Sequence, residues 1–108
     1  MEQFDFENLT AERRKSLAQT IHPISVSEMS KLGDELFKHL DDPWRAAYFE
    51  FIAENRGANF YHATTSDAVH ILYCKDKDKG IWFLPGQGKG RLQAMGRRTM
   101  RELIDASR

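Results

Sequence analysis

The chain has 108 residues, of which 41% are hydrophobic and 30% charged, and its formal net charge is zero. This size fits one domain, and the composition excludes a disordered chain. The single cysteine, Cys74, excludes an intramolecular disulfide, and the absence of a long apolar run or an apolar leader argues against membrane insertion and secretion. We therefore expect a soluble, cytoplasmic domain over residues 1–108, with residues 1–9 as a loosely ordered arm.

The charges are unevenly distributed along the chain. Residues 1–74 carry 12 acidic and 7 basic side chains, whereas residues 75–108 carry 4 acidic and 9 basic ones. Clustered lysines and arginines raise the local potential and attract anionic partners. The two ends could also attract each other or simply be solvated, and this structural explanation is favoured at the sequence level.

Two helices are predicted near the N-terminus. Thr10 can cap the first, which must end before His22 because a residue that precedes proline is disfavoured in the α region. The second opens with a capping box from Ser25 to Glu28. Its apolar residues recur at three- and four-residue steps, as expected for a helix that faces a core. They are Met29, Leu32, Leu36, Phe37 and Leu40.

A third helix is predicted to start at Asp42, which can cap it, and Pro43, which suits the first helical position. Gly57 is its expected left-handed terminator. After Gly57 the apolar period changes to two, and residues 59–64, 68–75 and 80–84 are predicted as strands of an antiparallel meander. A C-terminal helix beginning near Leu92 is expected to pack on this sheet. The predicted class is α+β, with three N-terminal helices, three strands and one C-terminal helix.

A register that places His62 opposite His70 and Cys74 opposite Ile81 divides the strand residues between two faces. One face holds Phe60, His62, His70, Leu72, Cys74, Ile81 and Phe83, and the other holds Tyr61, Ala63, Val69, Ile71, Tyr73, Trp82 and Leu84. Both faces are largely apolar. Either helices cover both, or one face contacts a second copy of the chain. The second alternative predicts an interface at Tyr61, Tyr73 and Trp82.

The segment from Gly80 to Arg91 has the most unusual composition in the chain. It is predicted to be a strand and a glycine-rich loop that lead into a helix, an arrangement that can direct backbone N–H groups and a positive helix end at one anion. The predicted anion-binding residues are Gly86, Gly88, Lys89, Gly90, Arg91, Arg97, Arg98 and Arg101. No nucleotide-binding fingerprint is matched. The alternative is that these glycines only form a tight turn, and this alternative is favoured.

Catalytic and metal sites are not predicted. Cys74 with His62 or His70 is the only Cys/His combination, and a buried, inert thiol explains it better. The carboxylates at helix ends are explained by capping. We therefore expect no metal and no cofactor, and an enzyme is the least favoured class of function.

Three classes of function remain, and the sequence favours them in the following order. A non-catalytic interaction module, acting through a protein partner or self-association, is favoured by the two apolar sheet faces. An anion, nucleotide or nucleic-acid binder acting through Gly86–Arg91 and the basic C-terminal helix is the alternative, although the near-neutral pI of 6.9 argues against nucleic acid. Convergence of Lys89, Arg97, Arg98 and Arg101 with the amides of the glycine-rich loop would reverse the order of the first two classes.

Overall fold

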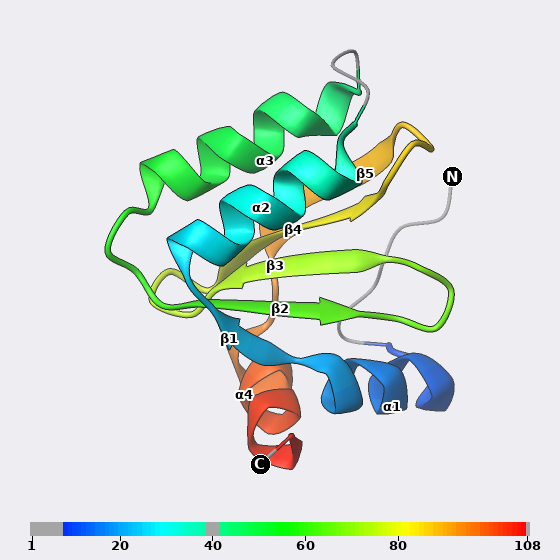
Figure 1. Cartoon of the computed structure of the whole chain (residues 1–108). Helices are drawn as coiled ribbons and strands as arrows, with labels where there is room; N and C mark the ends of the chain where they lie inside the picture. Colours follow the sequence, from blue (N-terminus) through cyan, green and yellow to red (C-terminus); the bar gives the residue numbers. More distant parts are fainter. Residues whose placement is uncertain (1–7, 39–41, 108) are drawn as a thin grey trace.

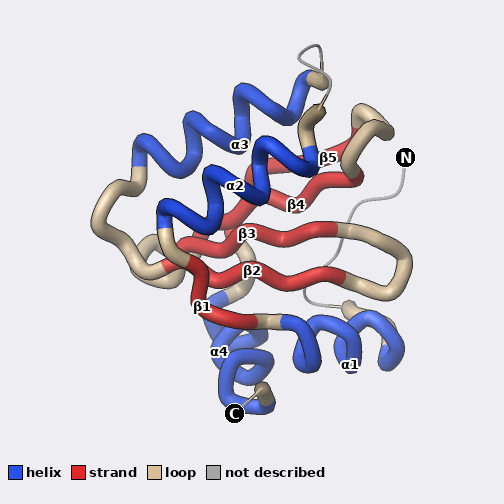
Figure 2. Tube along the Cα trace, viewed as in Figure 1, coloured by secondary structure: helices blue, strands red, loops and turns tan. Residues whose placement is uncertain are grey.

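The computed structural model describes residues 8–38 and 42–107, in which four helices and five strands form an α+β fold (Figures 1 and 2). The elements follow in the order α1 (Ala11–Thr20), β1 (His22–Ile24), α2 (Val26–Leu36), α3 (Pro43–Glu54), β2 (Phe60–Thr64), β3 (His70–Cys74), β4 (Lys79–Leu84), β5 (Lys89–Ala94) and α4 (Arg97–Ala106). All neighbouring strands pair antiparallel in sheet order β1-β2-β3-β4-β5. The predicted class is confirmed, but the three-stranded meander is extended by a strand at each edge.

Helices cover both faces of the sheet (Figure 1). One core, between the sheet and α2 and α3, contains Met29, Phe37, Tyr48, Phe51, Ile52, Phe60, Leu72, Cys74, Ile81 and Phe83. The other, between the sheet and α1 and α4, contains Leu17, Ile21, Ala63, Val69, Ile71, Tyr73, Trp82, Met95, Met100, Leu103 and Ile104. The predicted division of the strand residues between two faces is confirmed. A second copy of the chain is not needed to cover either face.

The predicted register is wrong by two residues at both turns. His62 lies opposite Leu72 rather than His70, and Cys74 lies opposite Lys79 rather than Ile81. The first loop is wider than expected because the Thr65 hydroxyl accepts a hydrogen bond from the Val69 amide and holds a five-residue connection. A shift of two residues preserves the side-chain alternation, which is why the face assignment survives.

The edge strand β5 replaces the predicted start of the C-terminal helix. Gly90 pairs with Phe83, and a Cβ atom there would lie 2.6 Å from the Trp44 ring, so only glycine lets α3 approach this strand so closely. Leu92, predicted to begin the helix, lies in β5 and is 54% exposed. Helix α4 begins only at Arg97, after Gly96 with φ of 70°. At the opposite edge, β1 contains Pro23, which suits an edge position.

The predicted starts of the first three helices are confirmed. The Thr10 side chain caps α1, Ser25 and Glu28 form the reciprocal capping box of α2, and Asp42 caps α3. Leu40, placed on the second helix by its spacing, and residues 1–7 of the predicted arm lie outside the described residues. No helix in the described ranges is long and apolar enough to cross a membrane.

Candidate functional site

The glycine-rich segment forms a hairpin turn between β4 and β5 and does not lead into a helix. Gly86 and Gly88 take φ values of 75° and 64°, which the turn requires. The Gly86 amide donates to the Asp42 carboxylate at 3.2 Å, and the Gln87 amide donates to the Leu84 carbonyl at 3.1 Å. These N–H groups are therefore directed at acceptors within the chain, and a carboxylate lies where the predicted anion would bind.

The structure also separates this turn from α4. The six residues of β5 lie between them, and an extended strand of that length spans about 20 Å. Lys89 and Arg91 are exposed on β5, whereas Arg97, Arg98 and Arg101 belong to α4. The predicted anion-binding residues therefore do not form one site, and the expected convergence of loop amides with the helix end is absent from the described structure.

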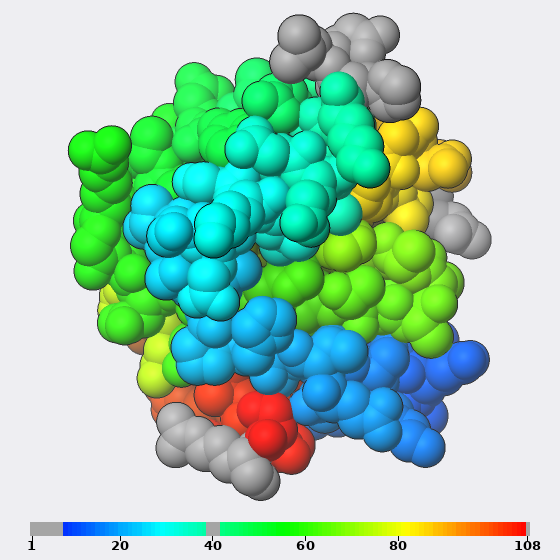
Figure 3. All heavy atoms as spheres, in the orientation of Figure 1, coloured from blue at the N-terminus to red at the C-terminus, as the bar shows by residue number. Residues whose placement is uncertain are grey.

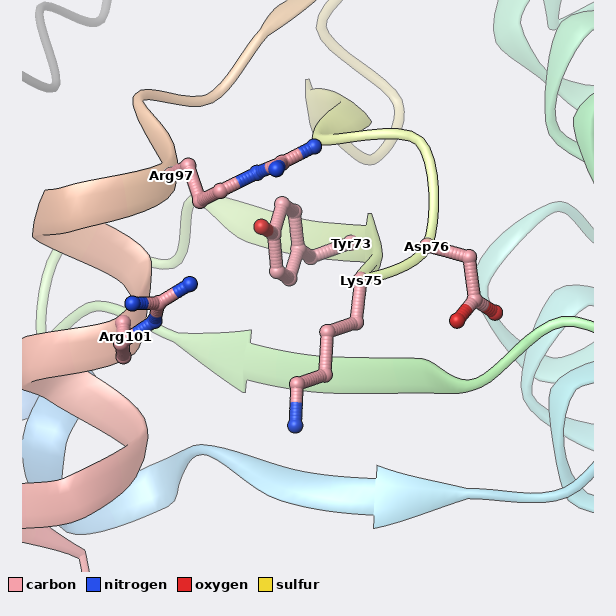
Figure 4. Close-up of a pocket in the computed structure, with 5 residues that line it drawn as sticks. All are labelled: Tyr73, Lys75, Asp76, Arg97 and Arg101. Atoms are coloured by element: carbon pink, nitrogen blue, oxygen red, sulfur yellow. The ribbon is translucent and has the colours of Figure 1, made fainter.

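Two of the predicted arginines instead line a pocket with residues from the end of β3. The pocket has a volume of about 180 Å³ and is lined by Tyr73, Lys75, Asp76, Arg97 and Arg101. Arg97 and Arg101 are four residues apart on α4, so they project from the same side of the helix. Figure 4 shows both arginines and Lys75 arranged around the Tyr73 ring, while the Asp76 carboxylate points away from them. Three cationic groups thus surround one small cavity.

The acidic groups near the pocket are engaged elsewhere. Asp76 accepts a hydrogen bond from the Asn59 backbone amide at 2.7 Å, and this bond lowers the pKa of its carboxyl group. Asp78 accepts one from the Tyr73 hydroxyl at 3.0 Å. Burial, together with that bond to Asp78, raises the pKa of Tyr73, so its hydroxyl stays protonated at neutral pH. Asp76 therefore stays ionised, and the pocket keeps an excess of positive charge because three cationic side chains line it against this one carboxylate.

Several basic residues outside the pocket form ion pairs with carboxylates. Arg13 and Arg14 of α1 form ion pairs with Asp67 and Glu102 at 3.0 and 2.6 Å. Arg98 also pairs with Glu102, at 3.3 Å. Within residues 8–38 and 42–107, Lys75, Arg97 and Arg101 form no ion pair with a carboxylate. None of these ion pairs joins a basic residue of positions 75–108 to an acidic residue of positions 1–74. Among the described residues they therefore do not neutralise the charge asymmetry of the sequence, and part of the positive charge lies at the pocket.

The start of α4 adds to the positive potential. Gly96 precedes the helix and supplies no side-chain cap. Backbone N–H groups at a helix N-terminus carry partial positive charge. Since Arg97 is the first residue of α4 and also lines the pocket, this helix end lies close to the three cationic side chains.

The predicted interface residues are not available as a shared surface. Tyr73 and Trp82 are only 2% and 3% exposed, because α1 and α4 cover their face of the sheet. Tyr61 is half-buried against the same core. The interface predicted on this face therefore loses its basis at Tyr73 and Trp82.

The histidines form a pair but not a recognisable metal centre. His62 Nε2 lies 3.1 Å from His70 Nδ1, whereas Cys74 is fully buried in the core beneath α2 and α3. No group of three or more His, Cys, Asp or Glu side chains in the described part of the chain could hold a metal ion.

Sequence reasoning missed the contribution of Lys75. Lys75 is the last residue of the predicted strand 68–75, and nothing in its spacing connects it with Arg97 and Arg101. Comparison with models of protein families, with curated proteins and with solved structures finds no match to the chain. The functional argument therefore depends on the residues of the pocket.

Proposed function

We propose that the protein is a binding module for an anionic group, in the first place a phosphate, which occupies the pocket between the end of β3 and the start of α4. The observation that carries the proposal is the convergence of Lys75, Arg97 and Arg101 around Tyr73, none of which forms an ion pair with a carboxylate among the described residues. Like charges brought together in this way repel each other, and a bound anion offsets that repulsion.

Phosphate fits the donors of the pocket. Guanidinium groups present a planar fork of N–H donors that matches phosphate oxygens, and a lysine ammonium adds a compact charge. The volume of about 180 Å³ is below the range of roughly 300 to 1,000 Å³ that is usual for complete small-molecule ligands. The pocket is therefore suited to one anionic group of a larger ligand.

This proposal replaces the interaction module as the favoured function. The interaction module was favoured because two apolar sheet faces were expected, and contact with a second copy of the chain was one of the two ways to cover them. Both faces are now covered by helices of the same chain. The anion-binding alternative keeps Arg97 and Arg101 from its predicted residues, but its location moves from the Gly86–Arg91 turn to the β3–α4 pocket.

Isothermal titration with inorganic phosphate at low ionic strength tests the proposal. Lys75→Ala and Arg101→Ala should each weaken binding by about fivefold to tenfold, because each removes a charge-assisted contact in a half-open pocket. Lys77→Ala is the matched control, since Lys77 is exposed on the same hairpin but does not line the pocket. Its effect should stay within about twofold. Absence of phosphate binding, or an equal loss in the Lys77 variant, would contradict the proposal.

A further inference from the structure

A second pocket lies beside the basic one at the same end of the sheet. It has a volume of about 330 Å³ and is lined by Pro23, Ile24, Ser25, Glu28, Ala58, Asn59, Phe60 and Tyr61. The backbone amide of Lys75 donates to the Asn59 carbonyl at 2.9 Å, and Tyr61 pairs directly with Tyr73 across β2 and β3. Each pocket therefore contains residues that contact the lining of the other.

Lys75 connects the two pockets. It lines the basic pocket, and in Figure 4 its side chain extends across β2 in the direction of β1, on the side where Pro23 pairs with Tyr61. An anion held by Lys75 would thus have the rest of its molecule directed either into solvent or along the row from Tyr73 to Tyr61. The second direction leads to the pocket that Pro23 and Tyr61 line.

The chemistry of the second pocket differs from that of the first. Tyr61 and Pro23 supply an aromatic ring and a flat aliphatic ring on neighbouring strands. The Glu28 carboxylate and the Asn59 amide supply polar groups at the rim, and hydrogen bonds from Ser25 lower the pKa of Glu28, which keeps it ionised. A negative charge at this end disfavours a second phosphate and favours a flat group that carries hydrogen-bond donors.

We infer that the ligand is a nucleotide unit, with its phosphate held by Lys75, Arg97 and Arg101 and its base placed against Tyr61. This inference deepens the proposed function and rests on it. Stacking of a base on an aromatic side chain supplies affinity without sequence readout, and phosphate contacts from lysine and arginine supply the rest.

The inference is tested by comparing inorganic phosphate, ribose 5-phosphate and AMP on the full chain by isothermal titration. AMP should bind about tenfold more tightly than ribose 5-phosphate, which is the effect of one stacked base. Tyr61→Leu should abolish this difference and leave the affinity for ribose 5-phosphate within about twofold. Tyr61→Phe is the matched control, because it keeps the ring and should retain the preference for AMP.

The possible failures are distinguishable. If phosphate and ribose 5-phosphate bind but AMP shows no advantage, or if its advantage survives in Tyr61→Leu, the nucleotide inference is overturned and the anion-binding function stands. If none of the three ligands binds, the proposed function fails as well. A phosphotyrosyl peptide that binds more tightly than AMP would also overturn the inference.

The source of the nucleotide unit is determined by a further arm of the same experiment. A 5′-phosphorylated mixed-sequence tetranucleotide is titrated beside AMP at two salt concentrations. Tighter binding of the tetranucleotide, with a marked loss at high salt, supports the inference and identifies single-stranded nucleic acid as the source. Equal or weaker binding supports the inference with a free nucleotide as the ligand.

Discussion

His62 Nε2 lies 3.1 Å from His70 Nδ1, although the two residues are not opposite each other in the ladder. Their side chains meet diagonally on the sheet face that carries α2 and α3, and the His70 ring stacks on Phe83 with centroids 5.6 Å apart. Figure 3 shows that atoms of the β2–β3 region remain visible between α2 and α1. The pair therefore sits at the margin of a core, where burial opposes protonation.

Acid should destabilise the fold through this pair. Burial, reinforced by the neighbouring His70, lowers the pKa of His62 from 6.5 to about 4. Between these two pH values the unfolded chain therefore binds more protons than the folded one. The contribution of His62 to the free energy of unfolding is complete above pH 6.5 and decreases as the pH falls to 4. We expect a loss of about 3 kcal/mol at most. Urea unfolding as a function of pH measures it, and His62→Gln should lose most of this slope. An unchanged slope in that variant would assign the acid sensitivity to other groups.

The close approach of α3 to β5 should make Gly90 intolerant of a side chain. In Gly90→Ala the new Cβ would lie 2.6 Å from a Trp44 ring atom and 2.9 Å from the Trp82 carbonyl oxygen. We expect a loss of about 1 to 3 kcal/mol of stability. Arg91 lies on the same strand and is exposed, so Arg91→Ala serves as the control. It should change the free energy of unfolding by less than about 0.5 kcal/mol. Chemical denaturation of both variants provides the comparison, and equal stabilities would show that α3 does not pack against Gly90.

Removing the Tyr73 hydroxyl should affect stability but not anion binding. Its only hydrogen-bond partner within the described ranges is Asp78 Oδ1, at 3.0 Å. Tyr73→Phe leaves that half-buried carboxylate without its donor and should cost about 1 kcal/mol in thermal or urea unfolding. The affinity for phosphate should stay within about twofold, because Lys75, Arg97 and Arg101 remain in place. A tenfold loss of affinity would assign the hydroxyl to the anion instead.

The capping box of α2 gives a local test of the fold. The Ser25 hydroxyl accepts from the Glu28 amide, and the Glu28 carboxylate accepts from the Ser25 amide, both at 3.1 Å. Ser25→Ala should reduce stability by about 1 kcal/mol. Ser27 is also exposed and lies in the first turn of α2, two residues after Ser25. Ser27→Ala should have little effect on stability or increase it slightly, because alanine has the higher helix propensity. Similar losses in the two variants would contradict the cap.

The features that local sequence signals predict correctly are those controlled by neighbours in the chain. Thr10, Ser25 and Asp42 begin helices because each side chain satisfies amide groups two or three residues later. The alternation of apolar residues in β2 to β4 also predicts the two faces, even with the wrong register. Both signals operate over a few residues and need no knowledge of tertiary contacts.

The features that the sequence did not predict depend on contacts between distant segments. Strand β5 lacks apolar alternation, and Gly90 belongs in it because of Trp44, more than forty positions earlier in the chain. The candidate site shows the same limit. Arg97 and Arg101 were predicted to bind an anion, but they reach Lys75, at the end of β3, only because α4 packs on the sheet.

The most direct test of the account is to follow backbone amide resonances by two-dimensional NMR while inorganic phosphate is added at low ionic strength. We predict saturable shifts that are largest at residues 75–76 and 97–101, and that are absent after Arg101→Ala. The amides of the β4–β5 turn at residues 86–90 should not move. Shifts concentrated in that turn, or no saturable shift at the β3–α4 pocket, would contradict the account.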